Sequence, residues 1–455
     1  MFNDVKQMTD EELEKELRAI EKYESEIVSV DVSTLLIKKI DTSFLMDLKC
    51  TLTPNGELFR IDKQGFLPKM LEEMYEDRKK YKKLMLKAQQ EYEDEKDEAK
   101  RVELSKVIAR NKNLQLAKKV GLNSAYGAMG SKFFRFFDLR LAIAITLAGQ
   151  LSIRWIENKL NQYMNKLLLT DKDYVIASDT DSIYLRLGEL VGKVYGTEGK
   201  LNLPKEKVIE FMDRVCEQKI QPYIDKSYKE LADYVNAYSQ KMRMKREALA
   251  DRGVWTAKKR YVLNVYNNEG VQYKEPHLKI MGLEIAKSST PNAIKGKMYD
   301  LIKIIINGDE IQAQEFIKKF RNDFKNLRPE DISFPRGING ITNYMDSVTI
   351  YKKGTPIHIK GAILYNHYLK KMNLTKRYPL IMDGEKLKFT YLKQPNPFKE
   401  SVVSYQSILP EEFGIHEFID YDMQFEKAFV SPMRLIFDSI GWEIEKTSSL
   451  ESFFS

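Results

Sequence analysis

Two carboxylates separated by one residue are the sharpest chemical signal in the sequence: Asp179 and Asp181, in the string Asp179-Thr180-Asp181-Ser182. Short apolar runs flank this string, so we predict a β-hairpin with the carboxylates at its bend. Residues i and i+2 of an extended bend point the same way, so both carboxylates would face one cleft. Oxygen ligands of this kind suit Mg²⁺ and two-metal phosphoryl chemistry. The same string also occurs in ordinary turns, where its side chains satisfy backbone N–H groups.

A second group of candidate residues is basic and helical. The segment from Pro68 to about Leu116 is highly charged and has no interior Gly or Pro, which predicts an antiparallel helix pair whose second helix continues past residue 116. Arg78 and Lys82 are four residues apart, as are Lys119 and Asn123, so each pair shares a helix face. Two such faces could hold a triphosphate, with the guanidinium as a fork and the ammonium groups as point charges. The alternative is a solvated charged arm.

Asn123-Ser124-Ala125-Tyr126-Gly127 favours the binding interpretation over the solvated arm. Asn, Ser and Gly are poor choices for a helix interior. The ring of Tyr126 next to Gly127 would have open space beside it, which suits stacking against a base pair.

A third basic group is Lys258-Lys259-Arg260-Tyr261, at the start of an apolar run that predicts a strand. Basic residues on a strand edge can reach the phosphates and the minor-groove acceptors of a duplex. Charged residues also protect strand edges against aggregation, and the segment read alone favours neither interpretation.

Several further elements can be predicted from local patterns. Apolar residues at helical spacing predict a long helix over about Leu139 to Leu168. A later helix is predicted to begin with Thr290 as its N-cap and Pro291 at its first helical position, and to end at Gly308. Residues from about 204 to 239 also have a helical pattern. Together with the strand-like runs, these elements predict an α+β fold.

Composition places modest limits on function. The chain of 455 residues carries 74 Lys and Arg against 66 Asp and Glu, a net charge of +8, which only hints at a polyanionic partner. Its two cysteines suit a reducing compartment. The most apolar run, Leu141–Ile153, is too short to span a bilayer and is typical of a core helix, so we expect a soluble protein without membrane association.

Taken together and in order, these segments resemble a family B DNA polymerase, specifically the T-even bacteriophage type. The resemblance covers the chain from about Pro54 onward and rests on Arg78 through Lys82 and on five further strings: KKVGLNSAYGAMG, DTDSIY, KKRYVLNV, KIMGLEIAKSSTP and HIKGAILYN. Six ordered matches are unlikely to arise by chance.

The resemblance implies a role for each residue group. Asp181 would be an essential metal ligand and Asp179 a helper, with two Mg²⁺ ions as cofactors and Glu247 as a further carboxylate that touches a metal. The incoming deoxynucleoside triphosphate would be bound by Arg78, Lys82, Lys119 and Asn123, with Tyr126 below the nascent pair. Primer–template DNA would be contacted by Lys258, Lys259, Arg260 and Tyr261.

The resemblance also implies a domain organisation. Residues 1–67 would form a lead and palm entry, 68–128 helical-hairpin fingers, 129–255 a palm with an antiparallel sheet, and 256–455 a mixed thumb. The last residues resemble a tail that docks on a sliding clamp, with Leu450, Phe453 and Phe454 as an apolar plug. The alternative is that the two phenylalanines fold back onto the thumb.

One expected signature is missing from the sequence. Such polymerases carry another carboxylate in the string Asp-x-x-Ser-Leu-Tyr-Pro, before the first finger helix, and these residues do not contain it. Asp31, in Asp31-Val32-Ser33-Thr34-Leu35, is the nearest candidate for a degenerate version. No exonuclease region is recognisable.

We therefore expect the polymerase subunit of a split, phage-encoded replicative enzyme of the bacterial cytoplasm, whose partner chain supplies these parts. A non-catalytic DNA-binding or scaffold subunit, or a fragment of one longer polymerase, are the alternatives.

Overall fold

The computed structural model describes residues 29–197, 200–201 and 204–445, and the chain divides into two compact units. Unit 1 contains residues up to Leu249 and the short segment Asn267–Lys274. Unit 2 contains Ala250–Tyr266 and the residues from Glu275 onward. Helices combine with small two- and three-stranded sheets, and the paired strands whose direction is established run antiparallel, so the fold is α+β as predicted.

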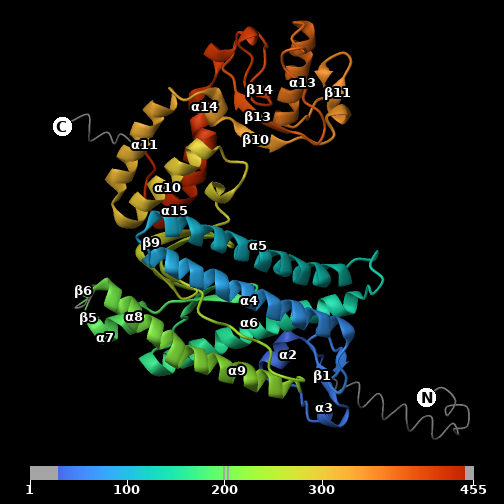
Figure 1. Cartoon of the computed structure of the whole chain (residues 1–455), viewed down its shortest axis with the longest axis vertical. Coiled ribbons are helices and arrows are strands. Elements are labelled where there is room, and N and C mark those ends of the chain that lie inside the picture. Colours follow the sequence, from blue (N-terminus) through green and yellow to red (C-terminus); the bar gives the residue numbers. More distant parts are fainter. Residues whose placement is uncertain (1–28, 198–199, 202–203, 446–455) are drawn as a thin grey trace, which may run out of the picture. The chain divides into compact units, whose positions relative to one another are not determined.

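Unit 1 is mostly helical (Figure 1). Its helices are α2 (Val32–Leu36), α3 (Phe44–Asp47), α4 (Phe66–Asp94), α5 (Glu98–Met129), α6 (Leu139–Leu168), α7 (Gly188–Tyr195), α8 (Lys205–Val215), the π-helix η2 (Cys216–Ile220) and α9 (Gln221–Tyr234). Its strands form three hairpins: β1 (Cys50–Leu52) with β2 (Leu58–Arg60), β3 (Val175–Asp179) with β4 (Ser182–Leu185), and β5 (Gly196–Thr197) with β6 (Lys200–Leu201).

The predicted helix pair is present as α4 and α5, which lie side by side and antiparallel in Figure 1. Asp97 ends the short connection between them, because its carboxylate accepts hydrogen bonds from the backbone N–H groups of Ala99 and Lys100 and so caps α5. Near the other end of the pair, Lys118 Nζ lies 2.6 Å from Asp77 Oδ2 and joins the two helices. The charged character of the segment therefore coexists with a defined antiparallel pairing.

Helix α6 has the bounds predicted from its periodicity and packs against α9. Trp155, Ile156 and Leu160 on α6 meet Ile224 and Tyr228 of α9 in the main core of unit 1. The indole Nε1 of Trp155 donates to the buried carbonyl of Ser227 at 2.9 Å. Among the described helices, α6 alone is long and apolar enough to cross a membrane, a property that core helices of soluble proteins share.

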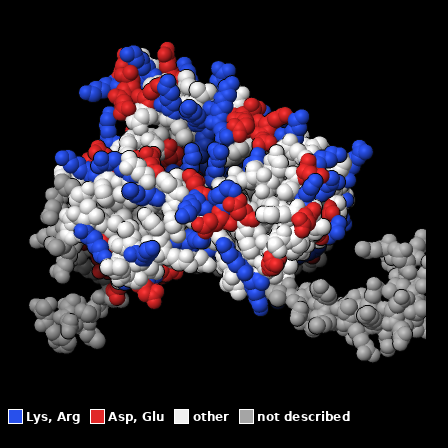
Figure 2. All heavy atoms as spheres, turned by 90° about the horizontal axis from the view of Figure 1, so that it is seen from below, with Lys and Arg blue, Asp and Glu red and all other residues white. Residues whose placement is uncertain are grey.

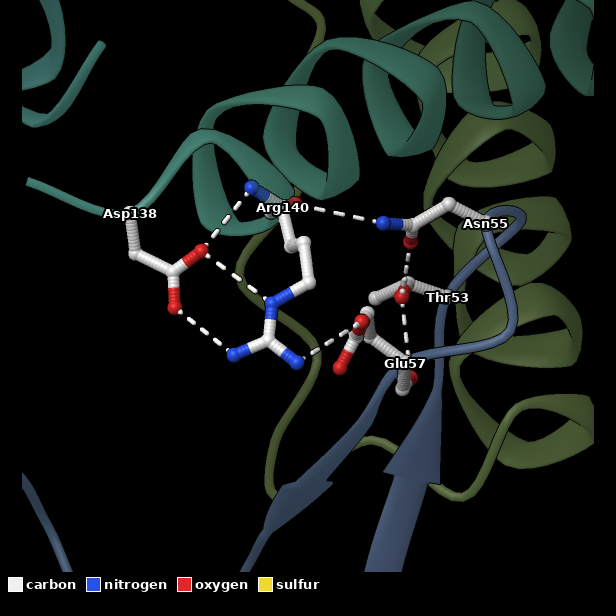
Figure 3. A network of polar contacts seen from close by, with 5 residues as sticks. All are labelled: Thr53, Asn55, Glu57, Asp138 and Arg140. Carbon is white, nitrogen blue, oxygen red and sulfur yellow. Dashed lines mark hydrogen bonds and ion pairs between the residues drawn. The ribbon is translucent and has the colours of Figure 1, made fainter.

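The start of α6 is tied to the β1–β2 hairpin by a polar network (Figure 3). Asp138 caps the helix and also pairs with Arg140, whose guanidinium reaches Glu57 at 3.7 Å. On the hairpin, Asn55 donates to the carbonyl of Arg140, and the hydroxyl of Thr53 lies 2.8 Å from the side-chain oxygen of Asn55. The turn that follows Thr53 is thereby held against the first turn of α6.

Unit 2 combines two three-stranded sheets with helices around one large core. Its sheet strands are β7 (Ala248–Ala257), β8 (Arg260–Asn268) and β9 (Val271–Met281) in the first sheet, and β10 (Phe334–Gly337), β13 (Lys386–Tyr391) and β14 (Val402–Tyr405) in the second, with β11 (Met345–Asp346) and β12 (Ile350–Tyr351) as a hairpin. Its helices are η3 (Glu284–Ala286), α10 (Asn292–Asn307), α11 (Glu310–Phe324), α12 (Pro329–Ile332), η4 (Ile341–Tyr344), α13 (Ile357–Lys371), η5 (Glu411–Phe413), η6 (His416–Phe418), α14 (Tyr421–Phe425), the π-helix η7 (Glu426–Val430) and α15 (Ser431–Ile440).

One predicted helix start is wrong by a residue. Pro291, not Thr290, is the N-cap of α10, and the hydroxyl of Thr290 donates to the carbonyl of Glu284 at 2.7 Å instead of capping the helix. Thr290 is buried, so its hydroxyl needs a partner, and the preceding turn supplies one. The predicted end of the helix at Gly308 is confirmed.

Candidate active site and nucleic-acid interface

The hairpin that carries the two carboxylates is present as β3 and β4, with Asp179 paired to Ser182 at its end. Thr180 and Asp181 form the turn, and Asp181 is exposed whereas Asp179 is half-buried. The inner face of the hairpin is held by Val175, Ile183 and Leu185, which pack on the α6–α9 core. The core thus supports a hairpin whose tip presents carboxylates at the surface.

The expectation of an extended bend between the two carboxylates is wrong. Thr180 has a φ of +58°, so the backbone turns there in the left-handed region and is not extended. The turn is closed by a 2.6 Å contact between the N–H of Asp181 and the carbonyl of Asp179. The hydroxyl of Thr180 donates to Asp179 Oδ1 at 3.0 Å. Asp179 and Asp181 are therefore joined by a tight turn and not by an extended bend.

The third predicted metal ligand, Glu247, lies outside the β3–β4 hairpin in the chain. No group of three or more His, Cys, Asp or Glu side chains with the arrangement of a metal site occurs among the described residues, and the ligand set of Asp179, Asp181 and Glu247 stays a prediction. Glu247 directly precedes β7, and its carbonyl accepts from the N–H of Glu269 at 2.5 Å. Burial, with a smaller contribution from the Asp181 carboxylate, raises the pKa of Tyr228 to about 12.

Asp31, the nearest candidate for the missing carboxylate, is a helix cap in this structure. It is exposed and caps α2, accepting from the N–H of Thr34 at 2.8 Å, and these hydrogen bonds lower its pKa below the usual range. Its role in the structure is that of a helix cap.

The predicted triphosphate ligands lie on the helix pair. Arg78 follows Asp77 on α4 and Lys119 follows Lys118 on α5, so both predicted ligands adjoin the Asp77–Lys118 ion pair in sequence. Arg78 is half-buried, and its Nε is buried without a hydrogen-bond partner among the described residues. Lys119 and Asn123 are exposed and are one helical turn apart on α5. The two predicted cationic faces therefore belong to two helices that pair with each other.

Lys82, one turn beyond Arg78, is already engaged. Its Nζ lies 2.5 Å from Glu269 Oε1, with the two side chains 33% and 23% exposed. Glu269 belongs to the segment of unit 1 that connects β8 with β9. Glu269 lies 187 residues from Lys82 along the chain, and the charge pattern alone does not indicate that the two residues pair.

Tyr126 continues the face of Lys119 and Asn123 and is also exposed. Its hydroxyl lies 2.8 Å from Thr146 Oγ1 on α6, a contact that fixes the ring and that the sequence did not indicate. A Cβ added at Gly127 would meet no atom within 4 Å, so the predicted open space beside the ring is present.

The basic segment of unit 2 differs from its prediction. Lys258 and Lys259 form the turn between β7 and β8 and do not lie on a strand edge, and Lys259 has a φ of +64°. Arg260 begins β8, and Tyr261 is buried beside Trp255, with ring centroids 6.0 Å apart. Only the two lysines and Arg260 are therefore positioned near the turn surface.

Gly282 makes room for this turn. A Cβ on Gly282 would lie 2.1 Å from the carbonyl oxygen of Lys259, and the residue has a φ of +67°. Replacing Gly282 by Ala would force a movement of the Lys258–Lys259 turn, in addition to the strain of a left-handed residue with a side chain.

We predict that Gly282→Ala lowers the thermal midpoint more than Gly414→Ala does. Gly414 is a matched control because its φ is +61° but an added Cβ would meet nothing within 4 Å. Both substitutions incur about 1–2 kcal/mol of left-handed strain, and only the first adds a clash. Differential scanning calorimetry of the full chain measures the two thermal midpoints. Equal shifts in the two variants would show that the Lys258–Lys259 turn can move without loss of stability.

Charged side chains of both signs are exposed on the face drawn in Figure 2. On the face in Figure 2, basic and acidic side chains are intermixed, with uncharged areas between them. The predicted clamp-binding residues Leu450, Phe453 and Phe454 lie outside the described residues.

Comparison with known proteins gives a consistent result. Residues 13–194 match the profile of DNA polymerase family B. The chain is similar to the DNA-directed DNA polymerases of Enterobacteria phage T4 (33% identity) and Escherichia phage RB69 (32% identity), with 88% of this chain and 49% of each relative covered. It is also 23% identical to the DNA polymerase delta catalytic subunit of Dictyostelium discoideum, over 76% of this chain and 27% of that protein. The chain spans about half the length of the phage relatives that it matches.

Proposed function

Because this chain belongs to DNA polymerase family B, and to its T-even phage type, we propose that it carries out template-directed DNA synthesis, adding deoxynucleotides to the 3′ end of a primer. One observation carries the proposal: a hairpin tip with two carboxylates and a helix pair with exposed cationic and aromatic residues belong to the same compact unit. Phosphoryl transfer needs both parts, since one activates the attacking oxygen and the other neutralises the triphosphate.

Asp179 and Asp181 would hold Mg²⁺ in this proposal. Hard carboxylate oxygens at an accessible turn fit this ion, which keeps several waters and binds through one or two carboxylates plus substrate phosphates. Bound Mg²⁺ supplies Lewis-acid stabilisation of the charge that develops on the phosphate oxygens. The tight turn between Asp179 and Asp181 would hold the two metal-binding residues in one short segment.

The helix pair would bind the incoming nucleotide. Arg78, Lys82 and Lys119 neutralise the triphosphate, and Asn123 donates to it from the next turn of α5. Tyr126, oriented by Thr146, stacks below the nascent base pair. Lys258, Lys259 and Arg260 contact the phosphates of primer–template DNA, and Tyr261 supports that turn from the interior. In this assignment residues 68–128 are fingers, 129–255 palm and 256–455 thumb.

We propose further that a separate partner chain supplies the first palm carboxylate and the exonuclease. The support is the absence of Asp-x-x-Ser-Leu-Tyr-Pro from these 455 residues, together with a two-carboxylate site where two-metal chemistry needs ligands from both palm segments. Like its phage relatives, the complex would act in the cytoplasm of a bacterial host.

The test is primer extension by the purified chain, alone and mixed with its partner. Alone, the chain should bind primer–template weakly and extend it negligibly, because half of the metal ligands are missing. The mixture should extend the primer in a Mg²⁺-dependent reaction. Robust synthesis by the lone chain would refute the split arrangement, and no synthesis by the mixture would favour a non-catalytic DNA-binding or scaffold subunit.

A clamp-binding role for the tail is a separate proposal. Leu450, Phe453 and Phe454 in a single short stretch would fill an apolar pocket on a sliding clamp. Deleting the last eight residues should spare distributive synthesis on short primers and remove clamp-stimulated synthesis on long templates. If the truncated enzyme, assembled with its partner, is stimulated fully by the clamp, the tail is not the tether.

A further inference from the structure

The tip of the β8–β9 hairpin lies along one face of helix α4. Glu269 pairs with Lys82, the backbone N–H of Gln272 donates to Gln90 Oε1 at 2.9 Å, and Lys274 Nζ donates to the carbonyl of Glu93 at 2.7 Å. These contacts explain why the segment Asn267–Lys274 belongs to unit 1 although the strands that lead to it belong to unit 2.

The tip uses the same face of α4 as the predicted triphosphate ligands. Lys82 and Gln90 are eight residues apart and Glu93 follows three later, which is the spacing of one helix face, and Arg78 lies one turn before Lys82. The Nε of Arg78 is buried and has no hydrogen-bond partner among the described residues. One helical turn beyond Arg78, the carboxylate of Glu269 therefore already pairs with the ammonium group of Lys82, which is predicted to bind the triphosphate.

Glu269 is held in place by the construction of the turn. The turn residues Glu269 and Gly270 have φ values of +53° and +93°. The side-chain oxygen of Asn267, a fully buried residue, accepts from the N–H of Gly270 at 3.0 Å and from Arg246, which in turn pairs with Asp213 at 2.5 Å. The N–H of Glu269 itself donates to the carbonyl of Glu247. The carboxylate thus projects from a supported turn.

We propose that the carboxylate of Glu269 competes with the triphosphate of the nucleotide for the ammonium group of Lys82. Glu269 thereby sets the affinity of this site for the nucleotide. The inference rests on the proposed function. One ammonium group cannot pair fully with a carboxylate and a triphosphate at the same position. The contacts of Gln90 and Glu93 involve backbone groups, so they can persist while Lys82 changes partner.

Binding of inorganic tripolyphosphate to the full chain tests this competition without requiring the partner or DNA. Glu269→Gln keeps the shape and removes the charge, so calorimetric titration should give a dissociation constant lower by about two- to five-fold, the range set by a partly exposed ion pair. Glu91→Gln is the matched control, since it removes an equal charge from α4 where Glu91 lies 3.7 Å from Lys87. The control should change the affinity less.

Combining Glu269→Gln with Lys82→Met distinguishes competition for Lys82 from positioning of Lys82 by Glu269. In the Lys82→Met background, tripolyphosphate should bind more weakly, and Glu269→Gln should have no further effect. If Glu269→Gln leaves the affinity unchanged or weakens binding while Lys82→Met weakens it, Glu269 positions Lys82 for the nucleotide and the competition is refuted. If Lys82→Met binds as tightly as the wild type, the proposed triphosphate site itself is wrong.

Discussion

Asp181→Asn should abolish primer extension by the assembled enzyme while leaving duplex binding within about two-fold. A metal ligand acts on the chemical step, and metal stabilisation of transition-state charge contributes several kcal/mol, so the loss of rate should be about 10³-fold or more. The substitution is isosteric and Asp181 is exposed, so the β3–β4 pairing does not depend on its charge. Single-turnover extension and a filter-binding assay measure the two effects separately.

Asp171→Asn is the control for this experiment. Asp171 is an exposed carboxylate before β3, outside the hairpin tip, and its replacement should leave the extension rate unchanged. If Asp181→Asn keeps a tenth of the wild-type rate, the carboxylate does not ligate the reacting metal.

Lys119→Ala should raise the KM for the nucleotide and lower kcat together. A charge-assisted phosphate contact forms in the ground state and strengthens in the transition state, so both constants change. A hydrogen bond to a charged group contributes about 1.5–3 kcal/mol, which corresponds to a loss of about 10- to 100-fold in kcat/KM. Steady-state kinetics of the assembled enzyme with a single nucleotide measure both constants.

Lys106→Ala provides the comparison on the same helix. Lys106 is exposed and lies 13 residues before Lys119, which places it on a different face of α5. Its replacement removes the same charge and should leave both constants unchanged. Equal losses in the two variants would mean that α5 attracts the nucleotide by its general charge, and wild-type kinetics for Lys119→Ala would remove Lys119 from the site.

The elements of the fold that rest on local patterns could be predicted. The bounds of α6 follow from its apolar period, and the pair α4 and α5 follows from a long run without Gly or Pro. The hairpin at Asp179 follows from two short strands around turn residues. Each signal is contained within the element that it predicts.

Details that depend on distant residues could not be predicted. Thr180 adopts a left-handed backbone that its type does not favour, and Thr290 finds its partner in the preceding turn, so both expectations failed. The Lys82–Glu269 ion pair and the contact of Tyr126 with Thr146 join segments whose proximity only the fold decides. The same holds for Tyr261, whose burial beside Trp255 the strand pattern does not reveal.

The small size of the β3–β4 sheet has a consequence for handling the protein. Among the described residues this sheet has two strands only, so neither outer edge pairs with a further strand, although the N–H of Val175 on β3 donates to Asn161 Oδ1. Two-stranded sheets are marginal by themselves, and open edges template pairing with other chains. Ile176, 48% exposed on β3, adds an apolar side chain to that edge. Produced in isolation, the chain carries an aggregation hazard at its candidate catalytic hairpin. Co-expression with a polypeptide whose β-strand pairs with this edge would remove the hazard.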